Sequence, residues 1–293
     1  MKRDKLFSLL SILFVASIMM CSCNMSMKDD ATVDYVALEI GSFDNMDGGN
    51  HISEYPIWSP EMLNYHQDQS APKEVSIVFN GNTYVGNYQK TSVSIPNTYL
   101  SHRYKGQNVY FETNKATGEL TSISFVYEPS KEATLTENDC KKIADGIADD
   151  YVVLKDYLVE TSSFAIYENM VYSFTYYREI NGYKTSDSLT VSIDGNGKIF
   201  SFGMNSLGAF KDIESVSYNS DKVQNAINSK LNDIYKDKSS RKEYNIDKSI
   251  LVRLEDGSVA LLYTINNQFE DGNETHGSQV QLLVKTQHNS KKQ

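Results

Sequence analysis

The residues that could do chemistry are scattered singly through this chain of 293 residues. Its five histidines, at 51, 66, 102, 276 and 288, lack the H-x-x-x-H spacing that places two imidazoles on one helix face for zinc. We therefore expect isolated histidines at the surface. The chain also has no Walker-type phosphate loop and no G-x-S-x-G nucleophile elbow. The sequence thus predicts no catalytic residue, no cofactor-binding residue and no metal ligand.

One short acidic stretch, Asp194-Gly-Asn-Gly197, has the composition of part of a calcium loop. A full loop needs alternating oxygen ligands and a distal glutamate, and the residues that follow do not supply them. Two glycines accept positive φ at low steric cost, which suits a tight turn between strands. The stretch therefore predicts a turn that joins two strands.

The first 23 residues have the pattern of an export signal. Lys2, Arg3 and Lys5 precede an apolar run over 6–20, which is too short to span a membrane comfortably. The run ends at Met20-Cys21-Ser22-Cys23, which resembles a bacterial lipoprotein signal. Cys23 follows a small residue and is the expected lipidation site, while Cys21 fits this role less well. The alternative is an ordinary cleaved signal or an uncleaved anchor.

Composition indicates an exported body without affinity for nucleic acid. The chain carries 38 acidic and 28 basic residues, a formal net charge of −10, whereas nucleic-acid phosphates require a basic surface. No second apolar run approaches membrane-spanning length. Cys140 is the one cysteine beyond the leader, and it lies on the apolar face of a predicted helix. We expect it to be a small buried side chain rather than a reactive thiol.

The stretch over 134–204 predicts one helix followed by an antiparallel sheet. Thr136 and Asp139 form a capping-box pattern, and apolar or small residues follow at helical spacing. That apolar face comprises Cys140, Ile143, Ala144, Ile147 and Tyr151. Strand-like runs punctuated by Asn181-Gly182 and by 194–197 then predict hairpins.

Similar patterns flank this central stretch. Hairpins are predicted over 75–88, on an Asn-Gly turn, and over 109–127. A helix that begins near Asn219 precedes a hairpin over 250–265 and a closing strand over 280–284. We predict an α+β fold of tandem modules, each an antiparallel sheet packed by one helix, after a signal peptide and a flexible linker. The predicted boundaries are signal 1–23, partly ordered linker 24–73, β-rich module 74–132, helix-plus-sheet modules 133–213 and 214–286, and tail 287–293.

Three segments carry a family resemblance: 134–144, 172–182 and 191–199. They resemble the L-T-x-x-x-A helix start and the two strand motifs of PepSY-like modules in exported bacterial proteins. Cys140 stands where that family usually has alanine. The resemblance implies the helix-plus-sheet fold, and it implies a role in restraining a protease, as in protease propeptides. It transfers no catalytic residue.

The expected function is therefore that of a non-enzymatic lipoprotein on the outer face of a bacterial cytoplasmic membrane, held there by its lipid anchor alone. Its body would be extracellular and would bind or regulate an envelope protein, a protease being one such partner. The abundance of tyrosine, 20 residues, favours binding because tyrosine provides large contact area at low entropic cost. Two alternatives stay open: a receptor for small ligands or glycans, and a hydrolase with a dispersed carboxylate site.

Overall fold

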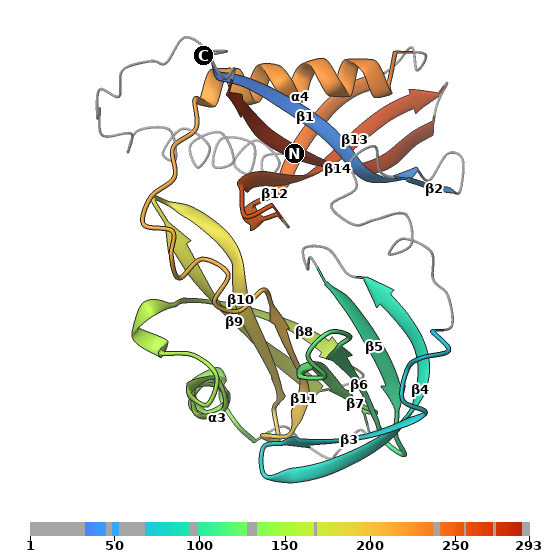
Figure 1. Cartoon of the computed structure of the whole chain (residues 1–293), viewed down its shortest axis with the longest axis vertical. Coiled ribbons are helices and arrows are strands. Elements are labelled where there is room, and N and C mark those ends of the chain that lie inside the picture. The colour runs from blue at the N-terminus through green and yellow to red at the C-terminus, as the bar shows by residue number, and fades with distance from the viewer. Residues whose placement is uncertain are drawn as a thin grey trace, which may run out of the picture. The chain divides into compact units, whose positions relative to one another are not determined.

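The structure is a computed structural model that describes residues 33–44, 49–52, 68–93, 99–127, 134–166, 169–236, 241–254, 256–271 and 274–288. Their contacts place the described residues from Asp34 to Gln287 in one compact unit. Figure 1 shows the described elements, which are dominated by strands.

Fourteen strands form the sheet within the described residues. They are β1 (Val33–Asp44), β2 (Gly49–Ile52), β3 (Glu74–Phe79), β4 (Asn82–Val93), β5 (Leu100–Lys105), β6 (Val109–Asn114), β7 (Leu120–Phe125), β8 (Leu158–Ile166), β9 (Asn169–Ile180), β10 (Tyr183–Asp194), β11 (Ile199–Asn205), β12 (Arg241–Arg253), β13 (Val259–Asp271) and β14 (Glu274–His288). The helices in the described part of the chain are α3 (Glu137–Asp149), α4 (Ser220–Ile234) and a short 3-10 turn, η1 (Leu154–Asp156).

The strands follow the order β2-β1-β14-β13-β12-β10-β11-β7-β6-β5-β4-β3, and β9 and β8 branch from β10. The predicted fold of tandem helix-plus-sheet modules is therefore wrong: the described residues form one large mixed sheet with two α-helices. The predicted hairpins do form, but further pairs join strands that are distant in sequence, such as β11 with β7. Local sequence patterns predict each hairpin. The distant pairs form because the unpaired edge strand of one hairpin can pair with the edge strand of another, and no local pattern specifies which one.

A bulge in β10 makes the connection between the two halves of the sheet. Three residues of β10, 185–187, lie opposite Arg178 of β9, because the register shifts between Lys184 and Ser188. At this point Thr185 pairs with Leu251 of β12 in parallel orientation. The Thr185 hydroxyl donates to the Arg178 carbonyl oxygen at 2.9 Å, which satisfies a backbone group inside the bulge.

Helix α3 forms as its cap and apolar spacing predicted. The Thr136 hydroxyl accepts from the Asp139 amide at 3.3 Å, and the Asp139 carboxylate accepts from the Thr136 amide at 3.3 Å, so the capping box is confirmed. Cys140, Ala144 and Ile147 are buried against β9 and β10. Of the other residues predicted on this face, Ile143 is half-buried and Tyr151 is partly exposed with its ring against Phe202.

Helix α4 covers a second core, over the strands nearer the C-terminus. The Asn219 side chain caps it by accepting from the Lys222 amide at 3.0 Å. Its residues Val223, Ile227 and Leu231 recur at helical spacing and are buried against β13 and β14. Each helix thus covers one region of a shared sheet (Figure 1).

The sheet face opposite α3 is lined with hydroxyl groups. Residues paired across antiparallel strands share a face, and one row consists of serines from five strands. They are Ser162, Ser173, Ser192, Ser201 and Ser124. Within this face the Oγ atoms of Ser173 and Ser192 lie 2.8 Å apart, so the polar side chains satisfy one another.

The stretch 194–197 is a tight turn, as predicted. The Asp194 carboxylate accepts from the backbone amides of Asn196 and Lys198 at 3.0 and 2.8 Å, and Gly197 has a φ of 82°. The same turn receives the chain entering α3, because the Gly195 carbonyl oxygen accepts from the Leu135 amide at 2.9 Å. A β-carbon on Gly197 would lie 2.9 Å from a Leu135 methyl carbon.

We predict that Gly197→Ala lowers the free energy of unfolding by about 2–4 kcal/mol, since it combines positive-φ strain with a steric clash. The matched control is Gly118→Ala, which has a φ of 74° and nothing within 4 Å of its β-carbon. That variant should lose about 1 kcal/mol, from the backbone term alone. Urea unfolding of both variants measures the difference, and equal losses would contradict the close packing of Leu135 on this turn.

Candidate functional site

Strand β8 forms an open edge of the sheet. It pairs with β9 on one side, in continuous register from Leu158 opposite Tyr177 to Ile166 opposite Asn169, and no described strand pairs with its other side. All of its residues except Ile166 are exposed. An open edge presents unpaired backbone amide and carbonyl groups, which can accept another strand.

Large apolar side chains project from this edge. Leu158, Val159 and Phe164 are 50%, 39% and 42% exposed. Because neighbouring residues of a strand point to opposite faces, Leu158 and Phe164 lie on one face and Val159 on the other. A strand added to β8 would therefore find apolar contacts on both faces.

Two polar contacts hold β8 in place. Just before the strand, the Tyr157 hydroxyl donates to the buried carboxylate of Asp187 in the β10 bulge at 2.6 Å. Burial, together with this hydrogen bond, raises the pKa of Tyr157 far above its usual range, so the phenol keeps its proton. Within the strand, Glu160 forms an ion pair with Lys184 of β10 at 2.6 Å. These contacts within the chain hold strand β8 in its position at the edge of the sheet.

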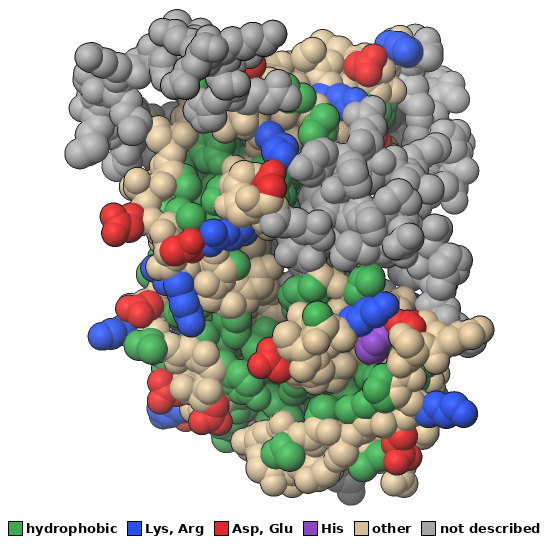
Figure 2. All heavy atoms as spheres, in the orientation of Figure 1, with side chains coloured by type: hydrophobic (Ala, Val, Ile, Leu, Met, Phe, Trp, Pro, Cys, Tyr) green, Lys and Arg blue, Asp and Glu red, His purple; other side chains and the backbone are tan. Residues whose placement is uncertain are grey.

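The edge at β3 differs from the edge at β8. Strand β3 pairs with β4 alone among the described strands, but it has six residues, of which Ile77 and Phe79 are buried. Strand β8 has nine residues, a single ionic side chain, no proline and no bulge, and so lacks the devices that usually block edge pairing. Figure 2 shows acidic and basic side chains scattered over the drawn face, without a large area of one sign.

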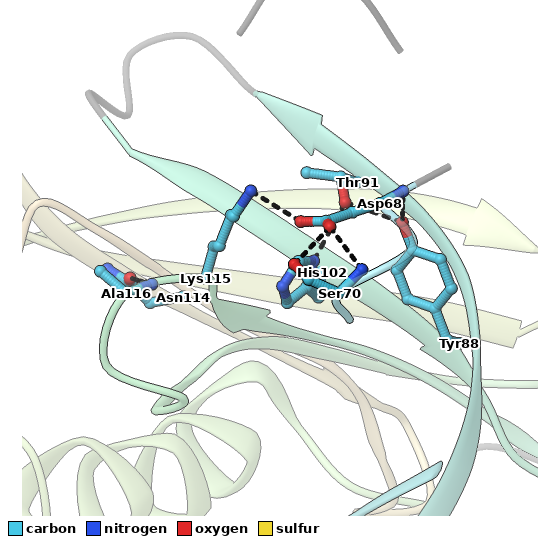
Figure 3. A network of polar contacts seen from close by, with 8 residues as sticks. All are labelled: Asp68, Ser70, Tyr88, Thr91, His102, Asn114, Lys115 and Ala116. Carbon is cyan, nitrogen blue, oxygen red and sulfur yellow. Dashed lines mark hydrogen bonds and ion pairs between the residues drawn. The ribbon is translucent and has the colours of Figure 1, made fainter. Parts of the chain in front are cut away.

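A second polar cluster includes Asp68 and Ser70, which lie just before strand β3 (Figure 3). The Asp68 carboxylate accepts from the Ser70 amide and hydroxyl at 2.9 and 2.5 Å, and it lies 2.6 Å from the Lys115 ammonium. Lys115, followed by the Ser70 contacts, holds the pKa of Asp68 well below its usual range. These contacts join the chain before β3 to the turn after β6.

A buried histidine continues this cluster. The Tyr88 hydroxyl accepts from the Asp68 amide at 2.9 Å and lies 2.8 Å from the Thr91 hydroxyl, which lies 3.0 Å from His102 Nδ1 (Figure 3). His102 is 6% exposed, so the prediction of a surface histidine is wrong for this residue. Burial lowers the pKa of His102.

The contacts of this cluster hold the chain before β3 against β4, β5 and the turn after β6. A histidine beside a hydroxyl could activate a nucleophile if the hydroxyl faced a substrate. Here Thr91 is buried and its hydroxyl contacts both Tyr88 and His102, so its hydrogen bonds are used within the fold. Sequence reasoning missed the cluster because Asp68, Tyr88 and Lys115 are brought together by the sheet and not by spacing.

The residues singled out in the sequence have separate locations. Cys140 is a free, fully buried cysteine, as predicted, and its thiol lies 3.5 Å from the Asp194 carbonyl oxygen. Cys23 and Cys21 lie outside the described residues, so their lipidation stays a prediction. Within the described residues, no group of three or more His, Cys, Asp or Glu side chains could hold a metal ion. None of the helices in that part of the chain has both the length and the hydrophobicity to cross a membrane.

We predict that His102 makes folding sensitive to mild acid. A buried ring with a lowered pKa stays neutral where the unfolded chain, with a pKa near 6.5, already binds a proton. Its stabilising effect is therefore full above pH 6.5 and is lost as the pH falls toward the folded-state pKa. Urea unfolding at pH 7.5 and 5.5 should show this loss in the parent chain and a smaller loss in His102→Gln, which cannot titrate. Equal losses in the two proteins would contradict the assignment.

Comparison with known proteins places the chain in a family. No curated protein and no solved structure matches it. The family described as "YcdB, YcdC repeated domain" matches residues 58–206, which include β3 to β11 and α3. The expected resemblance to PepSY-like modules is wrong, because no PepSY family matches and the matched region is mostly sheet. With about half of its length matched, this chain belongs to the YcdB, YcdC repeated domain family.

Proposed function

We propose that this protein binds a protein partner outside the cytoplasm by adding a strand of the partner to the open edge of β8. The observation that carries the proposal is this nine-residue strand, which is exposed along almost its whole length and has no described neighbour on one side. Strand addition supplies affinity through main-chain hydrogen bonds and specificity through alternate side chains.

The chemistry of β8 defines the partner segment. It should be extended and should carry apolar side chains at positions that meet Leu158, Val159 and Phe164, which are exposed on the two faces. The single carboxylate of the strand, Glu160, is already paired with Lys184, so the segment needs no basic residue opposite it. A protease partner rested on the PepSY resemblance alone and is not part of this proposal.

Membrane attachment through Cys23 would place this edge at the cell surface. The attachment is supported by the sequence, where the apolar run ends at two cysteines and the second follows a small residue. Residues 24–32 are polar or small apart from Met25 and Met27, and they would separate the anchor from β1. The protein would thus be a tethered, non-enzymatic binding protein.

We expect Val159→Lys and Phe164→Lys each to weaken partner binding at least about tenfold, because a lysine on an edge strand opposes pairing. The partner is first trapped by a photo-reactive amino acid at position 159 in intact cells, and purified partner is then titrated against each variant. Val78→Lys is the matched control: Val78 is 69% exposed on another edge strand, β3, and the change should leave affinity within about twofold.

Cross-linking to one extracytoplasmic protein from position 159 but not from position 78 would support the proposal. Equal cross-linking from both positions, or unchanged affinity in both lysine variants, would contradict it. Adducts with a second copy of the chain alone would show instead that β8 pairs with itself.

A separate prediction concerns the anchor. Cys23→Ala should release the protein from the membrane fraction into the medium, because the mature chain would lack its acyl groups. Cys21→Ala should leave it attached and serves as the control. Fractionation followed by immunoblotting measures both variants, and retention of Cys23→Ala at the membrane would argue against lipidation at this residue.

A further inference from the structure

A pocket lies beside helix α4, between the helix and strands β10, β12 and β13. Its volume is about 200 Å³, which is below the range of about 300–1,000 Å³ that drug-sized ligands occupy, so it can admit only a small ligand. Three tyrosines from separate parts of the chain line it: Tyr183, Tyr218 and Tyr263. None of the nine described side chains in the lining is charged. The pocket therefore suits a neutral ligand.

Aromatic rings make one wall of the pocket rigid. The rings of Tyr183 and Tyr218 meet edge to face with centroids 6.0 Å apart, and Tyr35 packs on Tyr218 in the same way at 6.2 Å. The Tyr218 hydroxyl donates to the Val259 carbonyl oxygen at 3.1 Å, and the Tyr35 hydroxyl accepts from the Asn219 amide at 2.8 Å. Ring edges and faces held in this way attract the C–H groups of a ligand without having to reorganise.

Two of the tyrosines keep hydroxyls available for a ligand. Among the described residues, the hydroxyls of Tyr183 and Tyr263 have no hydrogen-bond partner. Burial raises the pKa of Tyr183 and raises that of Tyr263 to about 12, so both stay protonated donors at neutral pH. The pocket thus offers neutral hydroxyl donors next to aromatic rings.

An oriented amide adds an acceptor. The Gln224 side-chain nitrogen donates to Asn228 Oδ1 at 3.2 Å and to the Tyr244 hydroxyl. The Tyr244 hydroxyl in turn donates to Asn228 Oδ1 at 2.6 Å, which fixes the arrangement. With its nitrogen held, the Gln224 amide leaves its oxygen as the free acceptor, while Val223 and Leu261 supply apolar lining.

We propose that this pocket binds a neutral pyranose sugar. A pyranose presents apolar C–H faces, which pack on tyrosine rings, and hydroxyls around its edge, which match the phenol donors and the Gln224 acceptor. An amino acid or a phosphorylated ligand would leave its charge without a partner among the lining residues, at a cost in binding. This site is separate from the β8 edge and shares no residue with it.

The test uses the purified full-length chain and four neutral probes: the methyl glycosides of glucose, galactose and mannose, and N-acetylglucosamine. Glucuronate is the charged comparison, and uridine is the comparison for a flat neutral ring. Saturation-transfer NMR detects binding, and calorimetry measures affinity. We expect at least one neutral pyranose to bind saturably and more tightly than glucuronate or uridine.

Variants then locate the binding. Tyr183→Phe and Tyr263→Phe each remove one hydroxyl while keeping the ring, and each should weaken binding about three- to tenfold. Tyr84→Phe is the matched control: Tyr84 is a half-buried tyrosine of β4 that packs on Phe125, and the change should leave affinity within about twofold. Thermal unfolding confirms that all three variants are folded.

Each outcome decides the proposal. Absence of saturable binding by all four neutral sugars would overturn it, as would affinity that is equal or greater for glucuronate or uridine. Sugar binding that neither pocket variant weakens would place the sugar elsewhere and would also overturn it.

Discussion

The bulge in β10 is the feature on which the arrangement of the sheet depends. A regular β10 would continue its pairing with β9 through residues 185–187, and its other edge would be free for β11 alone. The bulge allows the first part of β10 to meet β12 and the second part to meet β11. Its buried polar groups are then used in the fold: Thr185 bonds to β9, and Asp187 accepts from Tyr157 at the start of β8. The bulge thus joins the β12 part of the sheet to the β11 part, and its Asp187 holds the start of the edge strand β8.

Burial of the sheet is uneven, and this unevenness defines where the molecule can bind. Helix α3 covers the apolar face of β9 and β10, while the opposite face carries the serine row and remains polar. Helix α4 covers β13 and β14, but it leaves a tyrosine-lined pocket at one side. On strand β8, Leu158 and Phe164 lie on the serine face, which is opposite α3, and Val159 lies on the other face; all three stay exposed.

Tyrosine has several roles in this fold. Tyr176 is buried with its hydroxyl donating to Asp145 of α3 at 2.6 Å, which ties the helix to the sheet. Tyr157 does the same for β8 and the bulge, and Tyr88 links the Asp68 and His102 parts of the anchoring cluster. In each case the ring fills apolar space and the hydroxyl makes a hydrogen bond to a polar group on another part of the chain. High tyrosine content is therefore partly a structural requirement, so it does not by itself indicate a binding surface.

Residues that lie close together in the sequence are sufficient to specify the local elements. Helix α3 begins at its predicted capping box, α4 begins at Asn219, and the turns at Asn80-Gly81, Asn181-Gly182 and 194–197 join the predicted strands. These features depend on residues within a few positions of one another, and propensity, capping and positive φ act at that range.

Contacts between distant residues determine which hairpins share a sheet, which edge stays open and which polar groups meet. Pairs such as Thr185 with Leu251, or Ser201 with Ser124, join distant residues whose local patterns are equally compatible with other partners. His102 illustrates the same limit, because nothing beside it in the sequence indicates that Thr91 and Tyr88 will enclose it. Ser173 of β9 lies between Tyr172 and Phe174, and Ser192 of β10 lies between Val191 and Ile193, so each serine points to the face opposite its larger neighbours. Strand pairing, which is set by competition among many open edges, then aligned those serines into a row.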